Sequence, residues 1–254
     1  MPPQEQQPTR PPQERRPHPP PNPPAMSSYS DDMAAFYDAW AEREEELAAA
    51  LAAALGRRDV AVAPLVDAAV GHVATYYEHK SALADRDVVA ALDQRWLNPL
   101  ERTFLWAWGW KPALVFRFLN ASGAGAAAAG SPQQQRRALE ELRASTAAAE
   151  REVDREVAAV QESLAGPRVL AALRRQSAAR NGEADEAVAA VGRTLRVLLG
   201  TADALRQRTV RAVVALLAPD QAAAFVAAML GFHIAVRRAG RDWSSGHGVG
   251  RRGV

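Results

Sequence analysis

The chain has 254 residues, a formal net charge of +2 and no cysteine, and 48% of its residues are hydrophobic. This length and apolar content are enough for a buried core, which excludes disorder of the whole chain. The lack of cysteine excludes structural disulfides, thiolate nucleophiles and cysteine-bound zinc. The N-terminus is proline-rich, and no stretch approaches roughly eighteen uncharged apolar residues, so we expect neither a signal peptide nor a membrane span.

The net charge is unevenly distributed along the chain. Residues 1–28 sum to +1 and residues 237–254 to +4, which leaves −3 on residues 29–236. Because phosphate binding needs clustered positive charge, attraction to nucleic acid is expected only in the tails. The C-terminal cluster is a candidate nuclear-import or nucleic-acid patch, and its alternative is a solvated basic tail; its members are Arg237, Arg238, Arg241, Arg251 and Arg252.

The first 28 residues differ in composition from everything that follows. They hold eleven of the 17 prolines and no aromatic or branched aliphatic residue, which predicts a disordered tail prone to polyproline II. Helices then follow, with apolar residues at helical spacing. We expect one from about residue 31 to Leu55 with residues 42–46 (EREEE) on its solvated face, one from Pro64 to about Ala82, and a short one from Asp85 to Leu92.

Residues 96–112 carry the most concentrated signal, since four of the six tryptophans lie there: Trp96, Trp106, Trp108 and Trp110. Asn98 is an N-cap residue, Pro99 suits the first helical position, and Glu101 can complete a capping box. We therefore expect a helix from Pro99 to Trp108, with Gly109 just past its end and Lys111-Pro112 breaking the pattern. The indoles could form a core, a stacking platform for nucleic acid or a partner surface; few basic residues are interleaved with them, which favours the core.

The rest of the chain is also helical in pattern. A short helix is expected near residues 112–119, long helices near 131–165 and 183–216, and a final helix from Pro219. Residues 121–131 are predicted to form a Gly/Ala-rich linker. No segment shows the alternation of a strand. The prediction is an all-α multi-helix bundle over residues 29–243, in two halves joined by the linker, with a flexible basic tail at 244–254.

The order of these features resembles the plant delay-of-germination (DOG) domain. The resemblance rests on Phe36 and Trp40, His72 with Tyr76-Tyr77 and Lys80, Trp96-x-Asn98-Pro99-Leu100-Glu101, Trp106-x-x-Gly109-x-Lys111-Pro112, and Leu217-Ala-Pro-Asp-Gln221 followed by Phe225 and Arg241-Asp242. It spans about residues 33–242. The chain departs from the family pattern at three positions: Asn98 replaces Ser or Thr, Trp108 replaces a glycine and Ala113 replaces a serine.

This resemblance implies regulation rather than catalysis. Stand-alone members of the family regulate seed dormancy and germination in abscisic acid signalling and are proposed to bind type 2C protein phosphatases. The domain also follows the basic leucine zipper of TGA-type transcription factors, so an alternative is a transcription-associated factor. Residues 1–28 contain no basic helix and no leucine heptads, so DNA contact is expected to be weak or indirect, through a bZIP partner. The expected location is the nucleus, the cytoplasm or both, and a homodimer is compatible with the pattern.

The histidines are the remaining candidates for chemistry. His72 and His79 are seven residues apart on one helical face, but no second cluster completes a metal site, and a half-exposed pair is the simpler interpretation. The family resemblance implies haem bound by two histidines one turn apart in the last helix. Here the matching positions are His233 and Arg237, so a packed His233 is preferred over a haem ligand and no cofactor is expected.

Overall fold

The computed structural model describes residues 26–57, 61–124, 133–164, 166 and 183–248. The predicted tail therefore lies outside the described residues as far as residue 25, and so do most of the predicted linker, Arg251 and Arg252. The described elements are α1 (Met26–Leu55), α2 (Ala63–Arg86), α3 (Val88–Asp93), α4 (Pro99–Thr103), β1 (Leu105–Trp106), β2 (Gly109–Trp110), α5 (Leu114–Ala121), α7 (Gln133–Leu164), α9 (Glu183–Leu216) and α10 (Pro219–Gly248).

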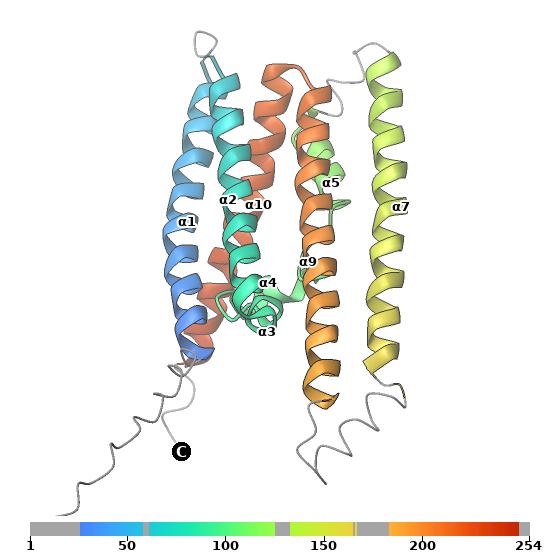
Figure 1. Ribbon diagram of the computed structural model, residues 1–254. Helices are drawn as coiled ribbons and strands as arrows, with labels where there is room; N and C mark the ends of the chain where they lie inside the picture. Colours follow the sequence, from blue (N-terminus) through green and yellow to red (C-terminus); the bar gives the residue numbers. More distant parts are fainter. Residues whose placement is uncertain (1–25, 58–60, 125–132, 165, 167–182, 249–254) are drawn as a thin grey trace, which may run out of the picture.

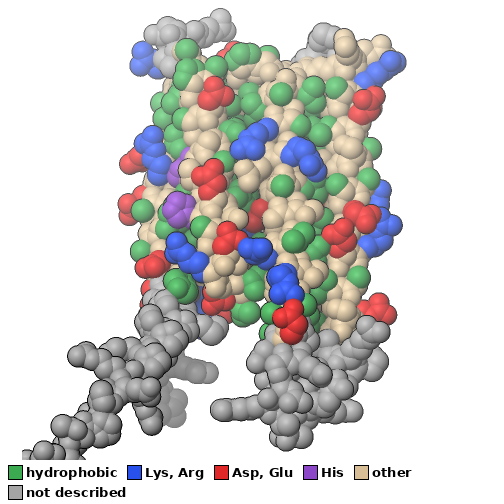
Figure 2. Space-filling view, viewed as in Figure 1, with side chains coloured by type: hydrophobic (Ala, Val, Ile, Leu, Met, Phe, Trp, Pro, Cys, Tyr) green, Lys and Arg blue, Asp and Glu red, His purple; other side chains and the backbone are tan. Residues whose placement is uncertain are grey.

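The helices form an upright bundle, which confirms the predicted all-α class. In Figure 1, α1, α2, α9 and α7 run alongside one another, α10 stands behind α2 and α9, and the short α3 and α4 close the lower end. The longest helices, α7 and α9, pack along each other, and α10 contacts α1, α2, α4 and α5. Side chains of both charge signs are interspersed on the face that Figure 2 shows.

Two helix starts differ from the prediction for local reasons. Helix α1 begins at Met26, before the Ser and Asp residues expected to cap it. Helix α3 is capped by Asp87 rather than Asp85: Asp87 has extended backbone angles, and its side chain accepts a hydrogen bond from the Ala90 N–H at 2.9 Å. Asp85 is still inside α2, where its carboxylate pairs with Arg196 of α9.

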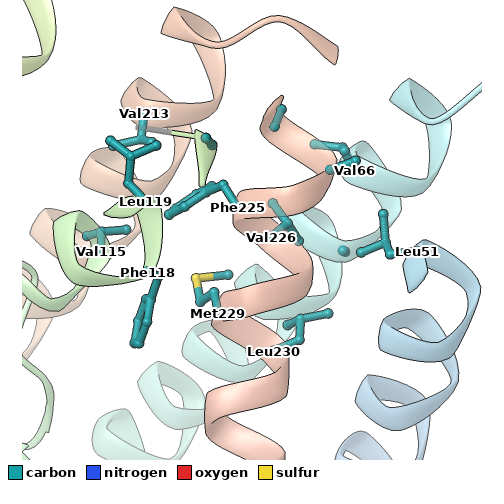
Figure 3. Close-up of a cluster of buried hydrophobic side chains, with 14 of the residues drawn as sticks. Leu51, Val66, Val115, Phe118, Leu119, Val213, Phe225, Val226, Met229 and Leu230 are labelled. Atoms are coloured by element: carbon teal, nitrogen blue, oxygen red, sulfur yellow. The ribbon is translucent and has the colours of Figure 1, made fainter. Parts of the chain in front are cut away.

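The main hydrophobic core lies between the upper parts of α1, α2, α5, α9 and α10. Figure 3 shows Leu51 and Val66 on one side of α10 and the α5 side chains Val115, Phe118 and Leu119 on the other. Two smaller clusters continue the core toward the lower end, where they include Met33, Tyr37, Trp40, Leu83 and Leu199. The predicted apolar stripes therefore face a common interior.

Helix α10 is the central element of this core. Its segment Pro219–Trp243 is the one described helix that could cross a bilayer by length and composition, and half of its most apolar stretch is buried in the bundle. Phe225, Val226 and Leu230 on this helix have no exposed surface. Packing against five other helices, α9 included, therefore accounts for its apolar residues.

Substitution by alanine is expected to have opposite effects on stability at two glycines of α10. A methyl group on the buried Gly240 would overlap the side-chain amide of Asn98, whereas one on the exposed Gly231 would meet nothing within 4 Å. We expect Gly240→Ala to lower the free energy of unfolding by about 1–3 kcal/mol, as in other overpacked sites. Gly231→Ala should raise it by about 0.5–1 kcal/mol because alanine loses less entropy in a helix. Urea unfolding followed by circular dichroism measures both, and equal effects would contradict the close approach of α10 to Asn98.

Candidate functional site

The signature segment begins with the predicted capping box. The Asn98 side chain accepts hydrogen bonds from the N–H groups of Leu100 and Glu101, each at 3.0 Å, and the Glu101 carboxylate accepts one from the Asn98 N–H at 2.9 Å. The Asn98 amide also donates to the Arg237 carbonyl of α10. The helix start predicted at Asn98-Pro99 is therefore correct, and the Asn98 side chain also joins α4 to α10.

The continuation of this segment was predicted wrongly. Helix α4 ends at Thr103, and residues 105–110 form a tight antiparallel hairpin in which Leu105 pairs with Trp110 and Trp106 with Gly109. The two residues at its tip, Ala107 and Trp108, have φ angles of 41° and 60°. A helix cannot include such residues, and non-glycine residues adopt positive φ only where the surroundings enforce it.

Side chains from α2, from α9 and from Gln94, which follows α3, enforce this conformation by binding the carbonyl groups of the hairpin. Arg206 donates to the carbonyl oxygens of Trp106, Ala107 and Trp110. The Trp108 carbonyl accepts from the Lys80 ammonium and from the amide of Gln94, the latter at 2.6 Å. We call Lys80, Gln94, Asp203 and Arg206 the hairpin clamp.

The clamp is buried, and one carboxylate pairs with both of its cations. Asp203 Oδ1 lies 2.5 Å from Arg206 and 3.2 Å from Lys80, and the side chains of both cations are at most 3% exposed. Burial, together with the positive charge of Arg206, lowers the pKa of Lys80 to about 8, although Asp203 opposes the shift. At Gly109, a β-carbon would lie 2.6 Å from the Arg206 guanidinium carbon, so glycine allows the close approach. Gly109 was expected as a helix stop and instead makes room for Arg206.

The four tryptophans of the segment have different environments. Trp96 donates to the Tyr76 hydroxyl at 3.3 Å, and with Trp108 it packs on the lower core. Trp110 is half-buried and stacks on His233, with 4.9 Å between ring centroids. Trp106 is half-buried: its indole N–H donates to Asp154 of α7 at 2.7 Å, and its ring lies near the cations of Lys111 and Arg206. Trp96 and Trp108 therefore pack on the core, whereas Trp106 lies at the contact between the hairpin and α7.

Lys111 and Pro112 connect the hairpin to α5. The Lys111 side chain is 46% exposed, and its ammonium is 3.8 Å from Glu150 of α7. Pro112 is buried. Glu150 lies in a charged run, residues 150–156, whose composition is typical of a solvated helix face, yet it accepts a hydrogen bond from the Ala113 N–H at 2.6 Å and is buried against the start of α5.

A second buried network joins α1, α4 and α10. Arg237 donates to Glu44 at 2.6 Å and to the Tyr37 hydroxyl at 3.2 Å, and Tyr37 donates to Glu101 at 2.5 Å. His233 Nδ1 lies 3.2 Å from the other Glu44 oxygen. The prediction that residues 42–46 form a solvated face was therefore wrong for Glu44, which has no exposed surface.

Charge pairing decides the protonation states of this network. Burial alone would raise the pKa of Glu44, but hydrogen bonding and charge from His233 and Arg237 outweigh it and lower the pKa. Burial alone would lower the pKa of Arg237, and the negative charge of Glu44 reverses that shift as well. Burial raises the pKa of Tyr37 far above its ordinary value, so this hydroxyl stays protonated. The network holds two buried ion pairs, Arg237 with Glu44 at 2.6 Å and Arg237 with Glu101 at 3.6 Å, and among the buried side-chain polar atoms of the described residues only Nη1 of Arg237 lacks a hydrogen bond.

These contacts answer the haem question raised for His233. The ring is stacked on Trp110 and bonded to Glu44, and the position one turn later holds Arg237, which is committed to Glu44. The two cavities that His233 lines measure about 40 Å³ each. At about 30 Å³ for each water molecule, each has room for only one or two. The residues around His233 therefore do not fit haem.

Other candidate residues also have defined partners. Arg237 is buried, so it is not available to the predicted basic patch, and Arg238 pairs with Glu45 on the surface at 2.7 Å. His72 stacks on Trp40, and burial lowers its pKa; His79 stacks on Phe36. Among the described residues, no cluster of three or more His, Asp or Glu side chains is placed to hold a metal ion.

Comparison with known proteins identifies the family. Residues 43–121 match the DOG1 family, described as seed dormancy control. Protein DOG1-like 4 of Arabidopsis thaliana is 30% identical over 179 residues, which cover 69% of this chain and 76% of that protein. The chain belongs to the DOG1 family. The Arabidopsis thaliana protein RESPONSE TO ABA AND SALT 1 is 28% identical over 181 residues, 68% of this chain and 76% of its own length.

A transcription factor shares a shorter part of the domain. Transcription factor TGAL9 of Oryza sativa subsp. japonica is 33% identical over 92 residues, which cover 32% of this chain and 26% of that protein. The names of these DOG1-family relatives are those of regulatory proteins, not enzymes. The chain therefore has a regulatory role typical of a DOG domain.

The buried Lys80 of this DOG1-family protein predicts an unusual pH dependence of stability. Its folded pKa of about 8 lies below the ordinary 10.5, so between these values the unfolded chain binds more protons and the free energy of unfolding rises with pH. The rise is at most about 3 kcal/mol, the equivalent of that shift. Above about pH 10 the trend reverses, because the buried Tyr37, Tyr76 and Tyr77 have raised pKa values and keep protons that the unfolded chain loses.

Urea unfolding between pH 7 and 11 measures this profile. Lys80→Met should abolish the rise above pH 8, and circular dichroism at pH 7 verifies that the variant is folded. Lys111→Met is the matched control because it removes the other lysine, which is exposed, and it should keep the rise. The same rise in Lys80→Met as in the unchanged chain would show that Lys80 is not the titrating group.

Proposed function

We propose that this chain is a non-enzymatic regulator of seed dormancy and germination in abscisic acid signalling, which acts by binding type 2C protein phosphatases. The observation that carries the proposal is the similarity, over about 180 residues, to two Arabidopsis proteins, one of which is named for its response to abscisic acid. The similarity covers about three quarters of each relative. It therefore concerns the domain as a whole, not one short motif.

The distribution of charged groups supports binding at the surface rather than chemistry in the interior. The cations and carboxylates of both buried networks bond to one another or to backbone carbonyls. The hairpin is held rigidly and presents Trp106 and Lys111 at the contact with α7. A rigid surface aromatic next to a cation is a common anchor in protein interfaces, since little entropy is lost on binding.

The second candidate function is a transcription-associated nuclear factor, favoured by the similarity to TGAL9. In this proposal the chain associates with bZIP factors, which hold the DNA. Direct DNA binding is a weaker form of the proposal, because Arg237 is buried and Arg238 is paired with Glu45. Two of the five arginines of the predicted patch are thus neutralised by carboxylates of α1.

A pull-down from maturing seed extract with the purified full chain, followed by mass spectrometry, distinguishes the two functions. We expect type 2C protein phosphatases among the enriched proteins and inhibition of the recovered phosphatase by the chain. Enrichment of bZIP factors without phosphatases would favour the second function. If neither class is recovered, both assignments of partner are contradicted.

A charge-reversal variant tests whether the hairpin face makes the contact. Lys111→Glu should reduce phosphatase recovery at least fivefold, because it places a carboxylate beside Glu150 and removes the cation from the Trp106 ring. Arg151→Glu is the matched control, since Arg151 is an exposed α7 residue with no hydrogen bond or ion pair in the described structure. Equal recovery with both variants would place the contact elsewhere.

A further inference from the structure

A groove between α5 and α7 is separate from the hairpin and from both buried networks. It has a volume of about 220 Å³. Its apolar lining comes from Phe116 and Leu119 of α5 and Leu139 of α7, all of which are buried side chains of the core. Asn120 lies beside them on α5. The volume equals the share of about seven water molecules, which is room for a single large side chain.

Two arginines of α7 line this groove without an anionic partner. Some exposed arginines of this chain pair with a carboxylate of another helix, as Arg196 does with Asp85 and Arg238 with Glu45. Arg136 and Arg143 are exposed and have no hydrogen bond or ion pair within the part of the chain that the structure describes. The guanidinium of Arg143 lies 5.8 Å from the centroid of the Phe116 ring, which keeps it over the groove.

The absence of a partner is not caused by a lack of nearby acid. Glu140 lines the same groove, four residues after Arg136 and three before Arg143, spacings at which helical side chains can meet. The described structure shows neither pair. Two guanidiniums and one carboxylate therefore each keep unused hydrogen-bonding capacity around an apolar floor.

The wider surroundings of the groove are positive. Arg117 of α5 and Arg137 of α7 are also exposed, so arginines outnumber the glutamates Glu140 and Glu141 by four to two in this region. Arg136 lies in the first turn of α7, where the helix dipole adds partial positive charge. This region thus attracts anions, although residues 29–236 together carry −3.

We propose that the groove between α5 and α7 binds an acidic peptide segment of a partner protein. An apolar side chain of the segment fills the groove over Phe116 and Leu139, and a carboxylate next to it accepts hydrogen bonds from Arg136 and Arg143. Glu140 accepts a backbone N–H of the same segment. Inorganic phosphate matches the groove poorly, because Glu140 would repel it and the apolar floor would stay exposed to water.

The proposal does not depend on the identity of the partner named above, and a random peptide library tests it without assuming a sequence. The full chain is immobilised and used to select from a phage-displayed library of random dodecapeptides. We expect selected peptides to share Asp or Glu within three positions of a large apolar residue. A synthetic copy of one such peptide, labelled with fluorescein, then gives affinities by anisotropy.

Substitutions in the groove decide whether the peptide binds there. Arg136→Gln and Arg143→Gln should each weaken binding at least tenfold, because each removes a charged hydrogen-bond donor from a carboxylate. Arg151→Gln removes the same charge from an exposed α7 position that does not line the groove, and it should leave the affinity within twofold. Both groove residues are exposed, so thermal unfolding should show that the variants remain folded.

Several results would overturn the proposal. Selection of no peptide, or of peptides without an acidic residue, would show that the groove does not have this specificity. Equal loss of affinity in Arg151→Gln would indicate a general charge effect. Displacement of the peptide by millimolar inorganic phosphate, with unchanged binding of a peptide that lacks the apolar residue, would identify an anion site rather than a peptide groove.

Discussion

The hydrogen bonds from Arg206 and Lys80 to the carbonyl groups of residues 106–110 are the contacts on which the arrangement of the signature segment depends. They connect α2 and α9 to the hairpin and fix two non-glycine residues at positive φ. Buried charges are costly to desolvate, so a buried cluster of ion pairs is weak evidence of added stability. The lowered pKa of Lys80 is the direct sign of that cost. The clamp thus selects one backbone conformation where the local sequence would allow several.

The second network fixes the position of α1 against α10, as the clamp fixes the conformation of the hairpin. Glu44 and Arg237 form an ion pair between the two helices, and Tyr37 and Glu101 extend it to the capping box of α4. Because the cap itself bonds to the carbonyl of Arg237, the three elements are fixed by one continuous set of hydrogen bonds. The buried polar groups of the domain are therefore mostly engaged in holding helices together, and the surfaces remain for recognition.

Two surfaces follow from this arrangement. The hairpin face combines Trp106 with Lys111 beside α7, and the groove on α5 and α7 combines an apolar floor with unpaired arginines. Both surfaces include residues of α7, a helix that is polar on average and that packs chiefly along α9. Under the two proposals above, residues of α7 contribute to both binding surfaces, so this one helix would contact two segments of a partner or two partners.

The sequence by itself determined the long helices, the capping box at Asn98 and the family. Apolar periodicity, Pro99 after Asn98 and Pro219 before the last helix are local signals, and the free energies behind them come from neighbouring residues. The hairpin could not be predicted in this way. Its positive φ angles are stabilised by Arg206, about a hundred residues away in the chain. No local propensity reports such a contact.

The same limit explains the errors in assigning charged residues to the surface. Glu44 and Glu150 each lie in a run of charged residues whose composition is typical of a solvated helix face, and only the position of α10 and α5 beside them shows that they are buried. Conversely, the unpaired state of Arg136 and Arg143 is visible only once α5 is in place. Sequence alone determined the long helical segments and the family to which the chain belongs. The tertiary structure decided which charges are paired, because pairing depends on distances between segments that the chain order does not fix.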